Sequence, residues 1–226
     1  MDAMKRFKQF ALAAALAAAM IAAGAANADV ILTFGQNDTA NTITGTDNGT
    51  GTTTITGTDV SISVTQIDPS AALATPFDAL FSLSATSSGA ATSVGSFVTQ
   101  DYSGSFCITS GAGCTGTIYL SGTFTDATFG QGASLTMSAA QPPGSLVFTS
   151  DVISPLNLGR GMAFSFANVT PGVHIAADGS LASFTSSVSG TLSANEVILE
   201  NPEPATLALL GIALAGLGFA QRRRRG

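Results

Sequence analysis

The chain has 226 residues, of which 45% are hydrophobic and only 10% are charged, and its formal net charge is −6. Residues 29–201 are more acidic than the whole, because they hold twelve of the fourteen acidic residues and a single basic residue, Arg160. A region with a formal charge of about −11 repels a phosphate backbone, which excludes nucleic acid as a partner. About 170 residues are enough for one domain with a core of its own.

The first 28 residues have the three parts of a secretory signal peptide with an apolar signal helix. Three basic residues among the first eight form a positive start, and an apolar run rich in alanine and leucine extends from Phe10 to about Ala26. The small residues that signal peptidase requires then follow, which predicts cleavage between Ala28 and Asp29. A retained membrane anchor is the alternative, and the shortness of the run favours removal.

Residues 29–200 show the two-residue alternation of strands and no helical period. Apolar residues alternate with threonine and serine, so each strand has one buried face and one wet face, as in antiparallel sheets. Turn residues such as Asp68-Pro69 and Asp178-Gly179 separate the runs. The pattern predicts an all-β domain, an antiparallel sandwich or jelly-roll-like fold. Its predicted core positions are Val60, Ile62, Val64, Phe81, Leu83, Ala85, Ile118, Leu120, Phe124, Leu135, Met137, Phe164, Phe166, Phe184 and Val188.

A six-residue segment, Thr42–Asp47, recurs unchanged as Thr54–Asp59. Two copies are too few for a solenoid, which needs about three repeats to bury a core. A hairpin with the three-residue loop 48–50 would place Ile43 directly across from Ile55. A calcium-binding repeat is the alternative, but the spacing does not fit the usual Asp-x-Asp-x-Asp-Gly loop.

The two cysteines, Cys107 and Cys114, are separated by six residues. Outside the cytoplasm, such a close pair predicts a disulfide across a hairpin. A metal site is the alternative, and the lack of a nearby histidine makes it the weaker one.

No catalytic motif stands out, so we expect no enzymatic activity and no cofactor. His174 is the only histidine; it lies in a predicted strand, Val173–Ala176, and no Gly-x-Ser-x-Gly motif accompanies it. A glycosidase needs only two carboxylates, but nothing in the sequence selects a pair. The aromatic platform typical of sugar binding is poorly supplied, because the domain has no tryptophan and only two tyrosines.

The C-terminal tail, residues 201–226, has three parts in a fixed order. Its elements are the motif Pro202, Glu203 and Pro204, the uncharged stretch 205–220, and a basic cluster of Arg222, Arg223, Arg224 and Arg225. The uncharged stretch predicts a transmembrane helix of roughly 24 Å, slightly shorter than the usual hydrocarbon core. Arginines accumulate on the cytoplasmic side, which would leave the β domain outside.

This order of Pro-Glu-Pro, apolar helix and arginine cluster resembles the PEP-CTERM sorting signal of Gram-negative bacteria that make exopolysaccharide. The resemblance covers the tail only. It implies recognition by exosortase, a membrane protease that cuts near the Pro-Glu-Pro, and therefore a transient membrane association. The expected partners are signal peptidase and an exosortase-like protease, with exopolysaccharide as a further candidate.

Two classes of function follow from these observations. The first is an exported structural or adhesive protein, held at the inner membrane during sorting and later found at the cell surface or in the extracellular matrix. The second is a secreted module that binds carbohydrate or calcium.

Overall fold

The computed structural model describes residues 29–194, except 41, 96, 132–134, 141–144 and 157–159 and the side chains of 94 and 131. The chain divides into two units, Met1–Glu196 and Val197–Gly226. The predicted signal peptide, transmembrane helix and arginine cluster lie outside the described residues. Within the described ranges, no helix is long and apolar enough to cross a membrane.

The described residues form strands with one short 3-10 turn, as the alternation predicts. The elements are β1 (Asp29–Gln36), β2 (Ile43–Asp47), β3 (Thr53–Ile67), η1 (Pro69–Ala71), β4 (Phe77–Ser87), β5 (Thr92–Val94), β6 (Phe97–Gly111), β7 (Thr115–Gln131), β8 (Leu135–Ala140), β9 (Leu146–Thr149), β10 (Arg160–Thr170) and β11 (Phe184–Ala194).

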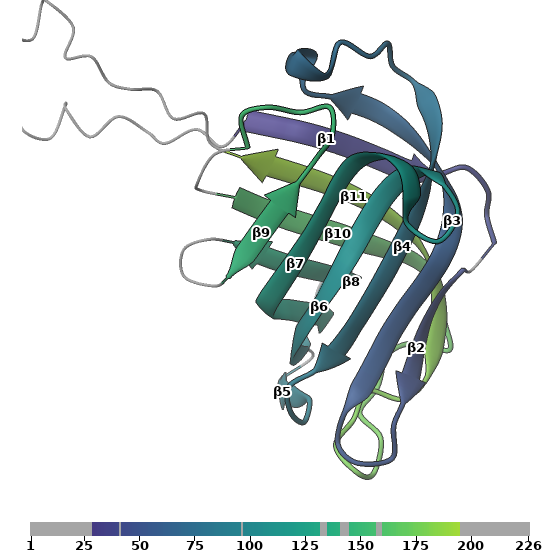
Figure 1. The fold of residues 1–226 in the computed structure, drawn as a ribbon. Helices are drawn as coiled ribbons and strands as arrows, with labels where there is room; N and C mark the ends of the chain where they lie inside the picture. Colours follow the sequence, from purple (N-terminus) through teal and green to yellow (C-terminus); the bar gives the residue numbers. More distant parts are fainter. Residues whose placement is uncertain are drawn as a thin grey trace, which may run out of the picture. The chain divides into compact units, whose positions relative to one another are not determined.

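All strand pairings are antiparallel, and they close the sheet on itself. The hydrogen-bonded ring runs β1-β3-β4-β6-β7-β8-β10-β11 and returns to β1. In Figure 1, β1, β11 and β10 cross behind β4, β6 and β7. The predicted all-β antiparallel class is confirmed. The two layers, however, are parts of one sheet and not the two separate sheets of a sandwich, because β7, β8 and β10 pair in succession.

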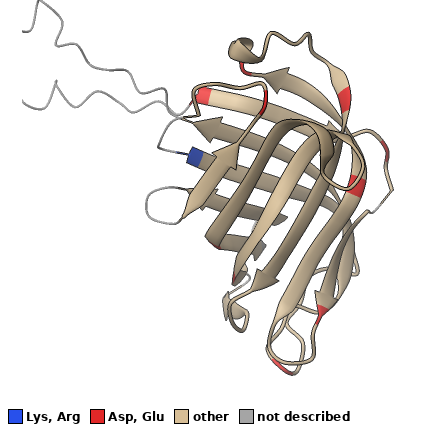
Figure 2. Cartoon of the chain, viewed as in Figure 1, with Lys and Arg blue, Asp and Glu red and all other residues tan. Residues whose placement is uncertain are grey.

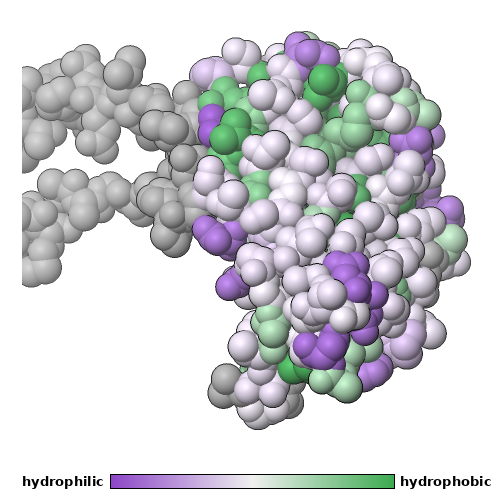
Figure 3. Space-filling view, turned by 60° about the horizontal axis from the view of Figure 1, so that its bottom comes forward, coloured by the Kyte–Doolittle hydropathy of each residue, from purple (hydrophilic) through white to green (hydrophobic). Residues whose placement is uncertain are grey.

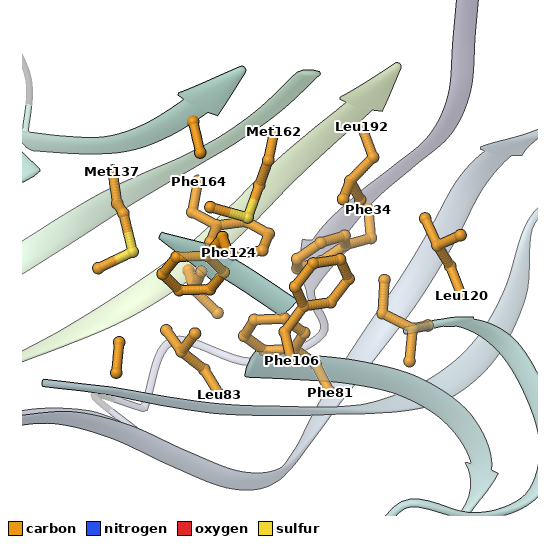
Figure 4. Packing of buried hydrophobic residues seen from close by; sticks show 14 of the residues in the cluster. Phe34, Phe81, Leu83, Phe106, Leu120, Phe124, Met137, Met162, Phe164 and Leu192 are labelled. Atoms are coloured by element: carbon orange, nitrogen blue, oxygen red, sulfur yellow. The ribbon is translucent and has the colours of Figure 1, made fainter. Parts of the chain in front are cut away.

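The core fills the space between these crossing layers. Rings from four strands meet there: Phe34, Phe81, Phe106 and Phe164, with centroids 4.9 Å apart for Phe34–Phe81 and 5.3 Å apart for both Phe81–Phe164 and Phe106–Phe164 (Figure 4). Every core position predicted from the alternation is buried except Ile118, which is half-buried. The two-residue period therefore identified the inward face of the six strands for which core positions were predicted: β3, β4, β7, β8, β10 and β11.

One position in the ring is filled by two short strands, with a break between them. β1 pairs with residues 62–67 of β3 and 189–194 of β11. β2 pairs with residues 53–56 of β3 and 184–186 of β11. Gln36 bridges the break: its Oε1 accepts the Val188 N–H at 3.1 Å and the Thr42 hydroxyl at 3.1 Å, while its amide donates to Asp38 at 2.7 Å. A side chain thus replaces the missing backbone partner, as a buried ladder requires.

The repeated segments form the predicted β2–β3 hairpin, but with a different register. Ile55 lies across from Gly45, not from Ile43, and the loop spans residues 48–52. The predicted Ile43–Ile55 pairing is wrong because the loop is two residues longer than predicted, and Ile43 instead lies against Gly57, where a Cβ would overlap its Cδ1. The glycine of one repeat makes room for the isoleucine of the other, and a shift by two residues keeps both isoleucines on the buried face.

Candidate functional site

The two ends of the β domain lie side by side. Asp29 begins β1 and pairs with Ala194, the last residue of β11. Of the two residues at the predicted cleavage site, the structure describes Asp29 and not Ala28. A cut before Asp29 would leave β1 whole. The sorting residues from Pro202 to Arg225 also lie outside the described part. Both predicted targeting segments nevertheless join the domain at neighbouring residues.

The predicted disulfide between Cys107 and Cys114 is present, with Cα atoms 5.9 Å apart. Cys107 lies in β6 and Cys114 in the turn that leads to β7. A second contact holds the same turn, because the Gly113 N–H donates to Asp59 Oδ1 of β3 at 2.8 Å. The β6–β7 hairpin tip therefore curls over β4 towards β3 (Figure 1).

Most aspartates act as acceptors for backbone N–H groups in turns or at strand ends. Such use is typical of aspartates in turns. It gives many of the acidic residues of this domain a structural role. These carboxylates are also engaged, and the described residues contain no group of three or more potential metal ligands. The acceptors and their donors are Asp38 with Ala40, Asp47 with Gly49, Asp59 with Gly113, Asp68 with Ser70, Asp151 with Ile118, and Asp178 with Gly51.

Asp178 joins two loops at the end of the domain far from Asp29 along the strands. Its Oδ2 accepts the Gly51 N–H at 2.8 Å, and its Oδ1 accepts the Ser180 hydroxyl at 2.6 Å and the Ser180 N–H at 3.1 Å. These hydrogen bonds, that from Gly51 first, lower the pKa of Asp178 to about 2. The carboxylate is therefore a structural acceptor and not a proton donor near neutral pH.

His174 does not lie in the predicted strand Val173–Ala176. Only Ile175 pairs there, in an isolated bridge with Leu181, because the loop turns back at residues 177–180. The imidazole is exposed, and its Nδ1 lies 3.0 Å from the Gly172 carbonyl. In the described part of the chain, His174 makes no hydrogen bond to a hydroxyl or a carboxylate.

Strands β3, β4, β6, β7 and β9 form the front layer, and its outer face carries rows of hydroxyl groups. One row runs across neighbouring strands as Thr56, Ser84, Ser105 and Thr123. The wet face of threonine and serine was predicted, but this row was not, because its members come together only through the strand register. A parallel row two residues along the strands contains Ser82, Cys107, Ser121 and Thr149.

Two shallow hollows lie between these rows. One, of about 280 Å³, spans β3, β4 and β6 beside the disulfide; the other, of about 190 Å³, spans β6, β7 and β9. Ser105 and Phe106 line both hollows, which therefore adjoin, and we call the two together the hydroxyl groove. Its lining is Thr56, Gly57, Thr58, Ser82, Leu83, Ser84, Ser105, Phe106, Cys107, Cys114, Ser121, Gly122, Thr123, Val147 and Thr149.

No charged side chain lines the hydroxyl groove. Acidic residues lie around the margins of the front layer, whose middle is uncharged (Figure 2). Arg160, the only lysine or arginine among the described residues, donates to the carbonyls of Leu146 and Leu156, both at 3.2 Å. When the bottom of the view in Figure 1 is turned forward, most of the visible surface is near the middle of the hydropathy scale. The largest group of hydrophilic residues lies in the lower middle of this view (Figure 3).

Comparison with known proteins identifies the C-terminal tail only. Residues 202–225 match the family model of the PEP-CTERM protein-sorting motif. No curated protein and no solved structure matches the chain. The matched residues include all those assigned to the sorting motif from the sequence. The chain therefore carries a PEP-CTERM protein-sorting motif, which implies export, processing by exosortase at the membrane, and delivery to the surface.

Proposed function

We propose that the chain is an exported, exosortase-processed protein whose β domain is a structural or adhesive component of the cell surface or extracellular matrix. The observation that carries this proposal is the sorting motif at residues 202–225. In the proposed order of events, signal peptidase cuts between Ala28 and Asp29, and the tail spans the inner membrane through 205–220. Exosortase then cuts near Pro202.

The geometry of the β domain supports this route. Because Asp29 and Ala194 are paired, the domain can fold while both of its ends are attached to one membrane. The closed sheet and the Cys107–Cys114 disulfide suit a domain that must persist outside the cell. What supports a non-catalytic role is the use of turn aspartates as structural acceptors and the exposed position of His174, whose Nδ1 lies beside the Gly172 carbonyl.

A pulse-chase experiment with cell fractionation tests the sorting step. Replacing Pro202 and Glu203 with alanine should hold the full-length protein in the inner membrane, because the apolar stretch and its arginines are unchanged. The control changes the preceding pair, E200A/N201A, and should be shortened and exported normally. Equally fast processing of P202A/E203A would refute the proposed sorting and leave a plain membrane anchor.

The proposed first cut has its own measurement. N-terminal sequencing of protein from the envelope or the medium should begin at Asp29. A mature chain that still contains Lys5 would show that the signal segment is retained.

A secreted carbohydrate-binding module is the second candidate, and the hydroxyl groove favours it. Fractionation separates the two roles: a domain found with matrix material supports the structural or adhesive role, whereas one free in the medium supports a soluble binder.

A further inference from the structure

We propose that the hydroxyl groove binds a segment of an uncharged polysaccharide chain. The inference deepens the proposed surface role and rests on it only for the presence of glycan around the exported domain. Three properties of the groove point to this ligand: its elongated course, its uncharged hydroxyl lining and its rigid walls.

The course of the groove fits a chain molecule better than a compact one. It crosses β3, β4, β6, β7 and β9, since its two hollows meet at Ser105 and Phe106. Neighbouring strands are about 4.8 Å apart, so four intervals give a length of roughly 19 Å. The row from Thr56 to Thr123 follows this direction and places one hydroxyl on each successive strand. A linear ligand along this row can therefore meet a hydroxyl on β3, β4, β6 and β7, and then Val147 on β9.

The lining matches the chemistry of sugars without ionic groups. Each serine or threonine hydroxyl can donate one hydrogen bond and accept others, as a sugar hydroxyl does. Val147, which is 44% exposed, supplies apolar surface for the C–H groups of a ring. A carboxylated or sulfated chain would lose hydration without gaining a basic partner, and the surrounding negative charge would repel it.

The groove is held in shape before any ligand arrives. The Ser121 and Thr149 hydroxyls are hydrogen-bonded at 2.6 Å on one side. On the other side, Asp59 accepts the Gly113 N–H, and the Ser82 hydroxyl accepts the Asp59 N–H at 2.9 Å. The disulfide fixes the adjoining wall at Cys107 and Cys114. Walls already ordered in the free protein reduce the entropic cost of binding a flexible chain.

The test is isothermal titration calorimetry on the exported protein. The probes are soluble mixed-linkage β-glucan, galactomannan and dextran, with polygalacturonate as an anionic counterpart. At least one neutral polysaccharide should bind, with an affinity that does not change as NaCl is raised, and polygalacturonate should not bind. Failure of all three neutral polymers, or tighter binding of polygalacturonate, would overturn the proposal.

Variants then locate the binding surface. S105I removes the shared hydroxyl and fills the centre of the groove, so it should weaken binding by at least roughly tenfold. S165I makes the same change on the exposed face of β10 and should bind as the original does. T123V, which removes only a hydroxyl from a residue of similar shape, should weaken binding less than S105I. Equal affinity of S105I and S165I, with melting temperatures like the original, would place the ligand elsewhere and refute the proposal.

The outcome is separable from the sorting proposal. Proteolytic shortening of the tail in the P202A/E203A experiment does not depend on the groove. If the unaltered protein is processed normally but binds no neutral glycan, only the groove proposal is refuted. If the unaltered protein binds glycan but its tail is never processed, only the sorting proposal is refuted.

Discussion

Two hairpins of the same sheet hold their tips in place by different chemistry. The β6–β7 tip is closed by the covalent Cys107–Cys114 bond and by the Gly113–Asp59 hydrogen bond. The β2–β3 tip has no covalent closure; its loop is tied through Gly51 to Asp178 on another loop. Near this tip, Gly45 and Gly57 leave room for the side chains of Phe184 and Ile43.

The difference indicates how each tip fails. A covalent closure resists acid and heat but depends on an oxidising compartment. A carboxylate that accepts N–H groups works in any redox state but is lost when it is protonated. The exported domain combines both, and the variants that follow separate the two contributions.

Loss of the disulfide should have the largest effect. The chain-entropy model assigns about 2.5 kcal/mol to a cross-link that closes an eight-residue loop. We expect C107S/C114S to lower the free energy of unfolding by about that amount, measured by urea denaturation. Reduction of the unaltered protein is the matched comparison and should give a similar loss. Equal stability of oxidised and reduced protein would show that the tip is held by Asp59 alone.

Filling the space beside Gly45 should come next. A Cβ at this position would overlap the Phe184 ring, which is fully buried, so G45A should cost about 1–3 kcal/mol of stability. G35A is the control, because a Cβ on Gly35 meets nothing within 4 Å. Alanine at Gly35 should be neutral or slightly stabilising, by about 0.5 kcal/mol. Similar melting curves for the two variants would contradict the close packing of the repeated segment.

Removal of the Asp59 carboxylate should have a smaller effect on the β6–β7 tip. D59A leaves the Gly113 N–H without its acceptor and puts alanine at a φ of 49°, so the expected loss is about 1–2 kcal/mol. D59N keeps an acceptor oxygen and tolerates positive φ, so it should retain most of the stability. Combined with C107S/C114S, D59A should show a non-additive effect, because both hold one turn. Strict additivity would mean that the two closures act independently.

The acid dependence of the β2–β3 tip should be the smallest effect. The pKa of Asp178, about 2, lies below its ordinary value of 3.8, so its contribution is fully present above pH 4 and is lost as the pH falls towards 2. D178N should therefore be less stable than the original at neutral pH, and the gap should narrow through this window. S180A removes only the hydroxyl that donates to Asp178. The difference in stability between S180A and the original should therefore change less over the same pH range than the difference for D178N. A gap that stays constant from pH 5 to about pH 2 would contradict the assignment.

The local pattern of the sequence predicts the strands well, and their assembly less well. Alternation at Val60, Ile62 and Val64 depends only on which face is buried, and these residues are buried as predicted. Closure into one ring depends on β7 pairing with β6 and also with β8. The break filled by Gln36 likewise involves Val188, 152 residues away along the chain. No local pattern contains such pairings.

The candidate sites divide in the same way. The disulfide joins two cysteines that are close in sequence, and the sorting motif is one short segment that resembles a known signal, so both can be predicted from local sequence. The hydroxyl groove combines residues from five strands, and its serines and threonines are not distinguishable in sequence from many others. The strand at His174 was predicted wrongly because the apolar residues around it pair at one point only, Ile175 with Leu181.

The pairing of Asp29 with Ala194 also determines how the domain responds to mechanical force. A protein held by its C-terminal end and attached to glycan at the front layer is pulled along β11. This strand lies between β1 and β10, with β2 continuing the line of β1, and its hydrogen bonds are perpendicular to its axis. Tension along β11 therefore shears many bonds at once and does not peel them one after another. The strand that leads to the tail is thus held along both of its edges.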